Sequence, residues 1–73
     1  MPDVIFTFSP DDSAPETIEV RDLDGAGIVA LKECADGQRP DAVLTLNYYI
    51  DGAGPRRGIF RGGRISDVRV KDR

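Results

Sequence analysis

Polar and apolar residues alternate in two short segments near the start of the chain. Residues 4–8 place Val4, Phe6 and Phe8 at every second position, and residues 16–23 place Ile18 and Val20 in the same way, which is the period of a strand with one buried face. Residues 9–15 contain two prolines, two acids and two serines, so they predict a loop between the strands. The inward-facing positions are Val4, Phe6, Phe8, Ile18 and Val20.

A helical spacing follows these strands. In residues 26–35, Ile28, Leu31 and Ala35 recur at intervals of three and four, which predicts one apolar face of a helix. Asp24 precedes the segment and offers a carboxylate to the first free backbone N–H groups. The sequence therefore predicts one short helix with Asp24 as its N-cap.

Glycines flank this segment and act in opposite directions. Gly37 fits the left-handed position that ends many helices. Gly25 and Gly27 weaken a helix start, and Ile28 and Val29 are β-branched residues that favour strands. A strand in this position is therefore the alternative.

The strongest strand pattern covers residues 42–50, whose high apolar content predicts a central strand. Residues 51–55 predict a hairpin connection, and residues 57–61 a short strand around Ile59 and Phe60. The inward face of the longer strand is expected to carry Leu44, Leu46, Tyr48 and Ile50.

A last strand is predicted over residues 65–71, with Val68 and Val70 inward. Gly62 and Gly63 precede it and can supply the positive φ values of a tight turn. We therefore expect the two C-terminal strands to form a tight hairpin.

These elements predict a single α+β domain over residues 1–73, in the order β-β-α-β-β-β. A small antiparallel sheet of four to five strands would carry one short helix on a face. Such a core makes one layer and no deep cavity. The expected core residues are Val4, Phe6, Phe8, Ile18, Val20, Ile28, Leu31, Leu44, Leu46, Tyr48, Ile50, Ile59, Phe60, Val68 and Val70.

Cysteine usage and hydropathy indicate where the protein acts. Cys34 is the only cysteine, so no internal disulfide can form, which favours a reducing compartment. No stretch approaches the ~20 apolar residues of a membrane span, and the first residues lack the features of a signal peptide. We expect a cytoplasmic protein, and no heptad or large apolar patch predicts a dimer, so we expect a monomer.

Charge is unevenly distributed around a net value of −3. Residues 1–55 hold eleven acidic and three basic residues, whereas residues 56–73 hold seven basic and two acidic residues. One interpretation is that the two parts neutralise each other across the sheet. Six of the seven bases are arginines, however, and arginine is favoured where planar contact with phosphate or carboxylate is needed.

Catalytic chemistry is poorly provided for. The chain has no histidine, which removes the commonest general base and the Ser-His-Asp and Cys-His arrangements. A zinc site would need to form without histidine and with one cysteine, and we expect Cys34 to be a small packed residue. The sequence therefore predicts a protein that is not an enzyme and holds no cofactor or metal.

Arginines cluster in residues 54–64, where glycines remove neighbouring side chains. Arginine and aromatic residues dominate the binding energy of protein interfaces, so we expect a partner to bind here. The predicted contact residues are Arg56, Arg57, Arg61 and Arg64, with Phe60 and Tyr49 as an apolar anchor.

Three alternatives concern this segment. It could be an exposed hairpin that only improves solubility. Arginines with an interleaved aromatic can also bind RNA or single strands, although the acidic body would repel a nucleic-acid backbone. An exposed sheet edge, near residues 6–8 or 59–60, could capture an extended partner segment by strand addition.

Three segments carry a resemblance that extends over the full length: MPDVIFTF at residues 1–8, LNYYI at 46–50 and RISDVRVK at 64–71. In these the chain resembles the small transcription regulators that lytic phages make to take over the RNA polymerase of their host.

The resemblance implies a factor that inhibits initiation at host promoters, with loss of the σ factor's grip, and acts as an antiterminator. It implies docking on the N-terminal region of the largest bacterial RNA polymerase subunit, near the RNA exit channel. NusA and nascent RNA would be neighbours, and the place of action would be the host bacterial cytoplasm. Inhibition of another host or phage protein is the alternative.

Overall fold

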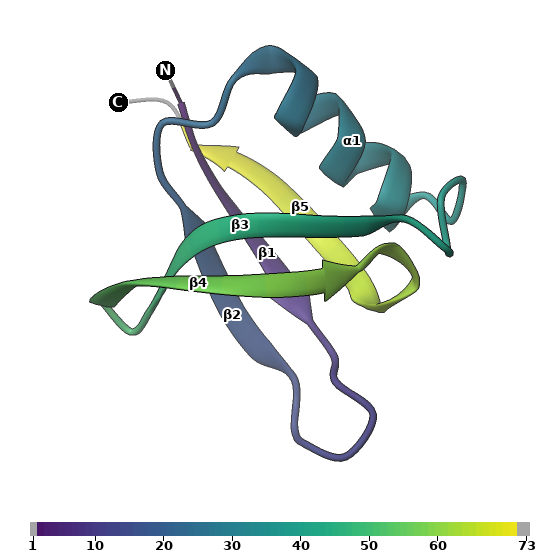
Figure 1. The fold of residues 1–73 in the computed structure, drawn as a ribbon. Coiled ribbons are helices and arrows are strands. Elements are labelled where there is room, and N and C mark those ends of the chain that lie inside the picture. The colour runs from purple at the N-terminus through teal and green to yellow at the C-terminus, as the bar shows by residue number, and fades with distance from the viewer. Residues whose placement is uncertain (1, 72–73) are drawn as a thin grey trace.

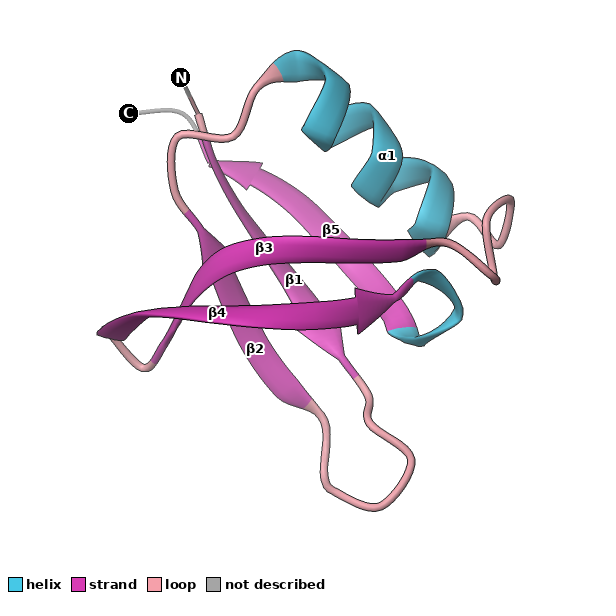
Figure 2. Cartoon of the chain, in the orientation of Figure 1, coloured by secondary structure: helices cyan, strands magenta, loops and turns pink. Residues whose placement is uncertain are grey.

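The computed structural model describes residues 2–71 and contains one sheet and one α-helix (Figures 1 and 2). The order β-β-α-β-β-β and the antiparallel sheet confirm the predicted α+β fold. No helix within the described residues is long and apolar enough to cross a bilayer. The elements are β1 (Asp3–Phe8), β2 (Glu16–Val20), α1 (Gly25–Ala35), β3 (Val43–Ile50), β4 (Ala53–Arg61), the 3-10 helix η1 (Gly62–Arg64) and β5 (Ile65–Lys71).

The strands lie in the order β4-β3-β2-β1-β5, and every neighbouring pair is antiparallel. β3 pairs with β2 at a single position, Glu19 opposite Tyr49. The β3–β4 hairpin does not lie flat beside β2, and in Figure 1 its two strands run across the directions of β1 and β2. β4 and β5 are the two edges of the sheet, although they follow each other in the chain.

The crossing of the hairpin over the sheet encloses the core. Phe60 of β4 meets Phe6 and Phe8 of β1 edge to face, with ring centroids 5.5 Å and 4.9 Å apart. Tyr48 of β3 packs against the same ring at 5.1 Å. Phe60 thus joins the two halves of the sheet. The buried apolar residues are Val4, Phe6, Ile18, Val20, Leu31, Cys34, Phe60 and Ile65.

Helix α1 is capped as the sequence predicts. The Asp24 carboxylate accepts a hydrogen bond of 2.7 Å from the backbone N–H of Gly27, which satisfies one free donor of the first turn. Gly37 has a φ of +80°, and its N–H donates to the Cys34 carbonyl at 3.1 Å, as in helices that end at a left-handed glycine. The helix packs against β5 and η1.

Cys34 lies on the buried side of α1 and is 2% exposed, which confirms its predicted packing. Burial raises the pKa of its thiol, because a thiolate would lose its hydration there. Arg39 lowers that pKa and Glu33 raises it, both by less. The thiol therefore stays protonated near neutral pH and behaves as a small apolar side chain.

The connection between β3 and β4 is shorter than predicted. The predicted hairpin is confirmed, but its extent over residues 51–55 is wrong, because the turn consists of Asp51 and Gly52 and β4 begins at Ala53. Both turn residues have positive φ, 51° and 78°, which suits a two-residue turn whose twist matches the strands. Arg56 consequently lies within a nine-residue strand.

The predicted tight turn at Gly62 and Gly63 is also wrong, because neither residue has a positive φ and both belong to η1. Their N–H groups donate to the carbonyls of Ala42 at 2.7 Å and Pro40 at 3.1 Å. A Cβ on Gly62 would collide with the Arg39 carbonyl oxygen. Close approach of two backbones explains this glycine, and the segment carries the chain from one sheet edge to the other.

The predicted core needs three changes. Ile59 is 69% exposed and Val70 also lies at the surface, whereas Ile65 is buried and was not predicted. A bulge interrupts the pairing of β5 with β1 around Asp67, whose φ is 53°. The bulge shifts the alternation of side chains, so one period cannot describe the inward side of β5.

Candidate functional site

The outer face of the β3–β4 hairpin carries arginines and apolar side chains together. Cross-strand partners share a face, so Arg57, Ile59 and Arg61 lie on the side opposite to Phe60. Every member of this face is exposed, and Val43 and Ile59 are exposed by 59% and 69%. The outer face consists of the paired residues Val43 and Arg61, Thr45 and Ile59, and Asn47 and Arg57.

The arginines of β4 have no acidic partner among residues 2–71. Arg56, Arg57 and Arg61 make no ion pair within the described part of the chain. Their neighbours across β3 are Tyr48, Asn47 and Val43, none of which can balance a charge. The guanidinium groups are therefore free to bind an outside acid.

Charge neutralisation within the molecule occurs at other arginines. Arg64 of η1 pairs with Asp11 of the β1–β2 loop, and Arg69 of β5 pairs with Asp67 at 3.3 Å. Both pairs are exposed and contribute little to stability. The interpretation that the two parts of the chain neutralise each other therefore holds for Arg64. Arg69 is paired within its own strand, and the arginines of β4 keep their positive charge.

An open hollow of about 310 Å³ adjoins one end of the outer face. The β1–β2 loop forms one wall of this hollow, and β3 and β4 form the other. Its lining combines four apolar residues with two arginines and one aspartate, and the aspartate is paired with Arg64. Arg61 therefore keeps a charge that is unpaired within residues 2–71 beside apolar surface, which suits a side chain of a partner. Its lining residues are Phe8, Pro10, Asp11, Val43, Ile59, Arg61 and Arg64.

The six predicted contact residues do not form one surface. Arg57 and Arg61 share the outer face, Arg64 lies beside its hollow, and Arg56 is opposite Tyr48 on the other side of β4. Phe60 is 4% exposed, so the expectation of an exposed anchor at this residue is wrong. The strand period assigns that place to Ile59, which had been predicted to lie in the core.

Tyr49 is half-buried and already has a partner. The Arg21 guanidinium lies 3.7 Å from the centroid of its ring, and Arg21 donates a 2.6 Å hydrogen bond to Glu19. That hydrogen bond raises the pKa of Arg21, whereas desolvation lowers it. The cation covers the face of the ring, so Tyr49 offers less apolar surface than Ile59.

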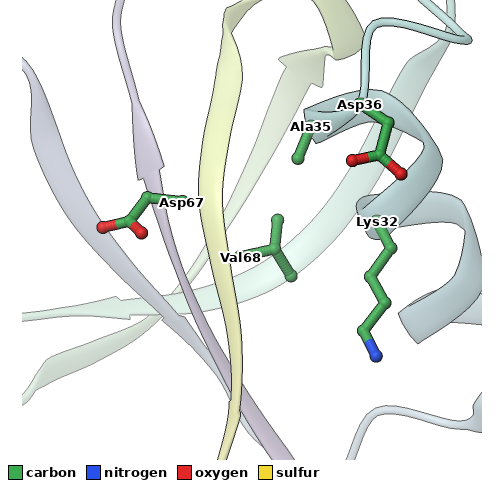
Figure 3. Close-up of a pocket in the computed structure, with 5 residues that line it drawn as sticks. All are labelled: Lys32, Ala35, Asp36, Asp67 and Val68. Carbon is green, nitrogen blue, oxygen red and sulfur yellow. The ribbon is translucent and has the colours of Figure 1, made fainter.

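A second hollow, of about 350 Å³, lies between α1 and β5. Figure 3 shows Lys32 and Asp36 at the end of the helix, whereas the carboxylate of Asp67 points away from them across β5. These groups do not converge on one point. Within residues 2–71, no group of three His, Cys, Asp or Glu side chains could hold a metal ion.

Comparisons with protein-family models, with curated proteins and with solved structures found no match to this chain.

Proposed function

We propose that the protein is a non-catalytic binding domain that acts on the RNA polymerase of a host bacterium. The observation that carries the proposal is the outer face of β4, where Arg57 and Arg61, unpaired within residues 2–71, flank the exposed Ile59. Arginine and apolar side chains in this combination suit an acidic protein surface with an apolar centre. The polymerase itself is proposed from the resemblance to phage transcription regulators.

Nucleic acid is the weaker candidate for this surface. Binding of single strands relies on aromatic rings that stack on bases. Phe60 is buried and Tyr49 is covered by Arg21, so neither ring is open to a base next to the arginines. A protein partner therefore fits the outer face better than RNA does.

In the proposed action, the domain docks on the N-terminal region of the largest polymerase subunit near the RNA exit channel. It inhibits initiation by weakening the grip of the σ factor and promotes read-through of terminators during elongation. NusA and nascent RNA would lie close to the bound domain, in the host cytoplasm. The domain would act by occupying a surface and would transform no substrate.

A pull-down of core RNA polymerase by the tagged protein tests this proposal, followed by promoter and terminator assays. Binding with reduced initiation and increased read-through is the expected result. The double variant Arg56→Glu with Arg57→Glu should lose binding, because two attractive contacts become repulsive. Lys32→Glu with Arg69→Glu is the matched control, since it changes net charge equally on α1 and β5.

Two results would contradict the proposal. Failure to retain polymerases from several bacteria, the natural host included, would remove the polymerase as partner. Equal loss of binding in both double variants would show that net charge matters and that the β4 surface does not. Circular dichroism of each variant separates loss of binding from loss of the fold.

A further inference from the structure

The free edge of β4 is a template for an added strand. β4 is nine residues long and pairs with β3 on one side, while no strand lies on its other side in the described sheet (Figure 1). Pro55 has no N–H group, and proline within a strand is typical of an edge. Between Arg56 and Arg61 no proline interrupts the strand, and every second residue turns its backbone N–H and C=O groups to the free side.

The other candidate edges are less suited to strand addition. The predicted edge near residues 6–8 is wrong, because β1 lies between β2 and β5. β5 is the second edge, but it contains the bulge at Asp67 and packs against α1. A bulge twists an edge out of line with an incoming strand. Strand addition therefore favours β4.

Charge selects the occupant of this edge. Arg56, Arg57 and Arg61 are exposed and unpaired within residues 2–71. A second copy of β4 would bring the same cations opposite them, and like charges across a strand pair are destabilising. An acidic segment would place carboxylates there and gain charge-assisted hydrogen bonds. The same arginines thus disfavour self-pairing and favour an acidic partner.

We infer that β4 binds an acidic, extended peptide segment as a sixth, antiparallel strand along residues 56–61. Main-chain hydrogen bonds would supply affinity, and alternate side chains would supply specificity. The segment would carry acids opposite Arg57 and Arg61 and an apolar residue opposite Ile59. The inference rests on the proposed function in one respect only, namely that the acidic segment belongs to the polymerase.

The register defines a probe. The hexapeptide acetyl-Glu-Thr-Val-Thr-Glu-Glu-amide, laid antiparallel, sets its first and fifth residues opposite Arg61 and Arg57, its valine opposite Ile59, and its last glutamate opposite Arg56. The same peptide with lysine for glutamate is the charge control. Two further versions carry N-methyl groups at the odd or at the even positions, since only one set of peptide N–H groups would face β4.

Titration of the isotope-labelled protein, followed by NMR, measures binding. The acidic peptide should shift the backbone amides of residues 56–61 and slow the exchange of every second one. One N-methylated peptide should bind at least ~10-fold more weakly than the other, and the lysine peptide should not bind. Equal binding of both N-methylated peptides would refute strand addition. Stronger shifts with a single-stranded RNA would refute a peptide as the occupant.

This inference and the proposed function can fail separately. If polymerase is retained but the peptide leaves the amides of residues 56–61 unchanged, strand addition is wrong and the polymerase proposal stands. If the peptide adds to β4 but no polymerase is retained, the edge is a peptide site with a different source of acidic segment. Arg57→Glu with Arg61→Glu should abolish peptide binding, whereas Lys32→Glu with Arg69→Glu should leave it within ~2-fold.

Discussion

Ile59 and Phe60 are neighbours in the chain, yet the sheet sends their side chains to opposite sides. Phe60 makes three edge-to-face contacts in the core, and Ile59 is 69% exposed between two arginines. A strand has a period of two, so a shift of one residue exchanges its faces. When two adjacent residues are both apolar, the sequence does not decide which of them faces the core. The pairing with the neighbouring strand decides it.

Truncation of these two residues should have opposite consequences. Ile59→Ala should change the free energy of unfolding by no more than about 0.5 kcal/mol, because little of the side chain is buried, and should weaken partner binding. Phe60→Ala should cost about 3–5 kcal/mol, because it empties the centre of the core. Urea unfolding and a binding titration of both variants measure this. Equal destabilisation would contradict the assigned faces.

Cys34 gives a prediction about pH. Its native pKa is raised above the ordinary value of 9.0, so the native state holds this proton more tightly than the unfolded state. The stabilisation that comes from this tighter proton binding is complete below pH 9, and it is lost as the pH rises through the native pKa. The free energy of unfolding should therefore fall more steeply above pH 9 than it does in Cys34→Ala. Parallel pH profiles for the two proteins would contradict this cause.

At the scale of elements, the glycines that lie between helices and strands are required for two different physical reasons. Gly52 and Gly37 supply positive φ values, which was predicted for Gly37 from its place after the helix. Gly62 instead permits close approach to the backbone at Arg39. Its partner lies over twenty residues away in the chain, and no local pattern shows such a contact.

Substitution of two glycines by alanine should show this difference. Gly62→Ala should destabilise by about 1–3 kcal/mol, as overpacking does, because the new Cβ meets a carbonyl oxygen. Gly25→Ala, at the start of α1, meets nothing within 4 Å and should stabilise by about 0.4–1 kcal/mol. Thermal unfolding of both variants tests the signs. If both substitutions destabilise the protein equally, the loss at Gly62 cannot be attributed to the collision of its new Cβ with the Arg39 carbonyl oxygen.

Local patterns predicted those parts of the fold that local chemistry decides. Asp24 and Gly37 bracket the helix, and alternation marks β1 and β3. The hairpin expected around Gly62 did not form, because β4 and β5 find their partners in β3 and β1. The arginines of the candidate site were predicted from their clustering in residues 54–64. Their apolar companion, Ile59, depended on cross-strand register, which composition does not contain.

At the scale of the whole molecule, charge is sorted by position. The body is acidic, while β4 carries three unpaired arginines on one edge of the sheet. Such a separation would orient the domain toward the proposed acidic partner before contact, and salt would screen this attraction over roughly 8–10 Å. Edge strands that lack charge can pair with one another, so we expect the same arginines to oppose pairing between two copies of the chain.

Removal of that charge should promote self-association. Arg57→Gln with Arg61→Gln keeps length and polarity but removes the repulsion between two β4 edges. Sedimentation should show a concentration-dependent dimer for this variant and a monomer for the unchanged protein at low salt. Lys32→Gln with Arg69→Gln controls for net charge. A monomeric double β4 variant at high concentration would show that the edge is protected by other means.

The division of β4 between core and solvent has a consequence for how the strand tolerates change. Gly58 lies under the Tyr48 ring, where a Cβ would come within 2.7 Å, and Phe60 fills the core, so variants at these positions would reduce cellular abundance. Variants at Arg57, Ile59 and Arg61 would leave abundance intact and reduce only partner capture. A saturation library scored for both traits would thus split one short strand into two interleaved sets, one shaped by selection for folding and the other by selection for recognition.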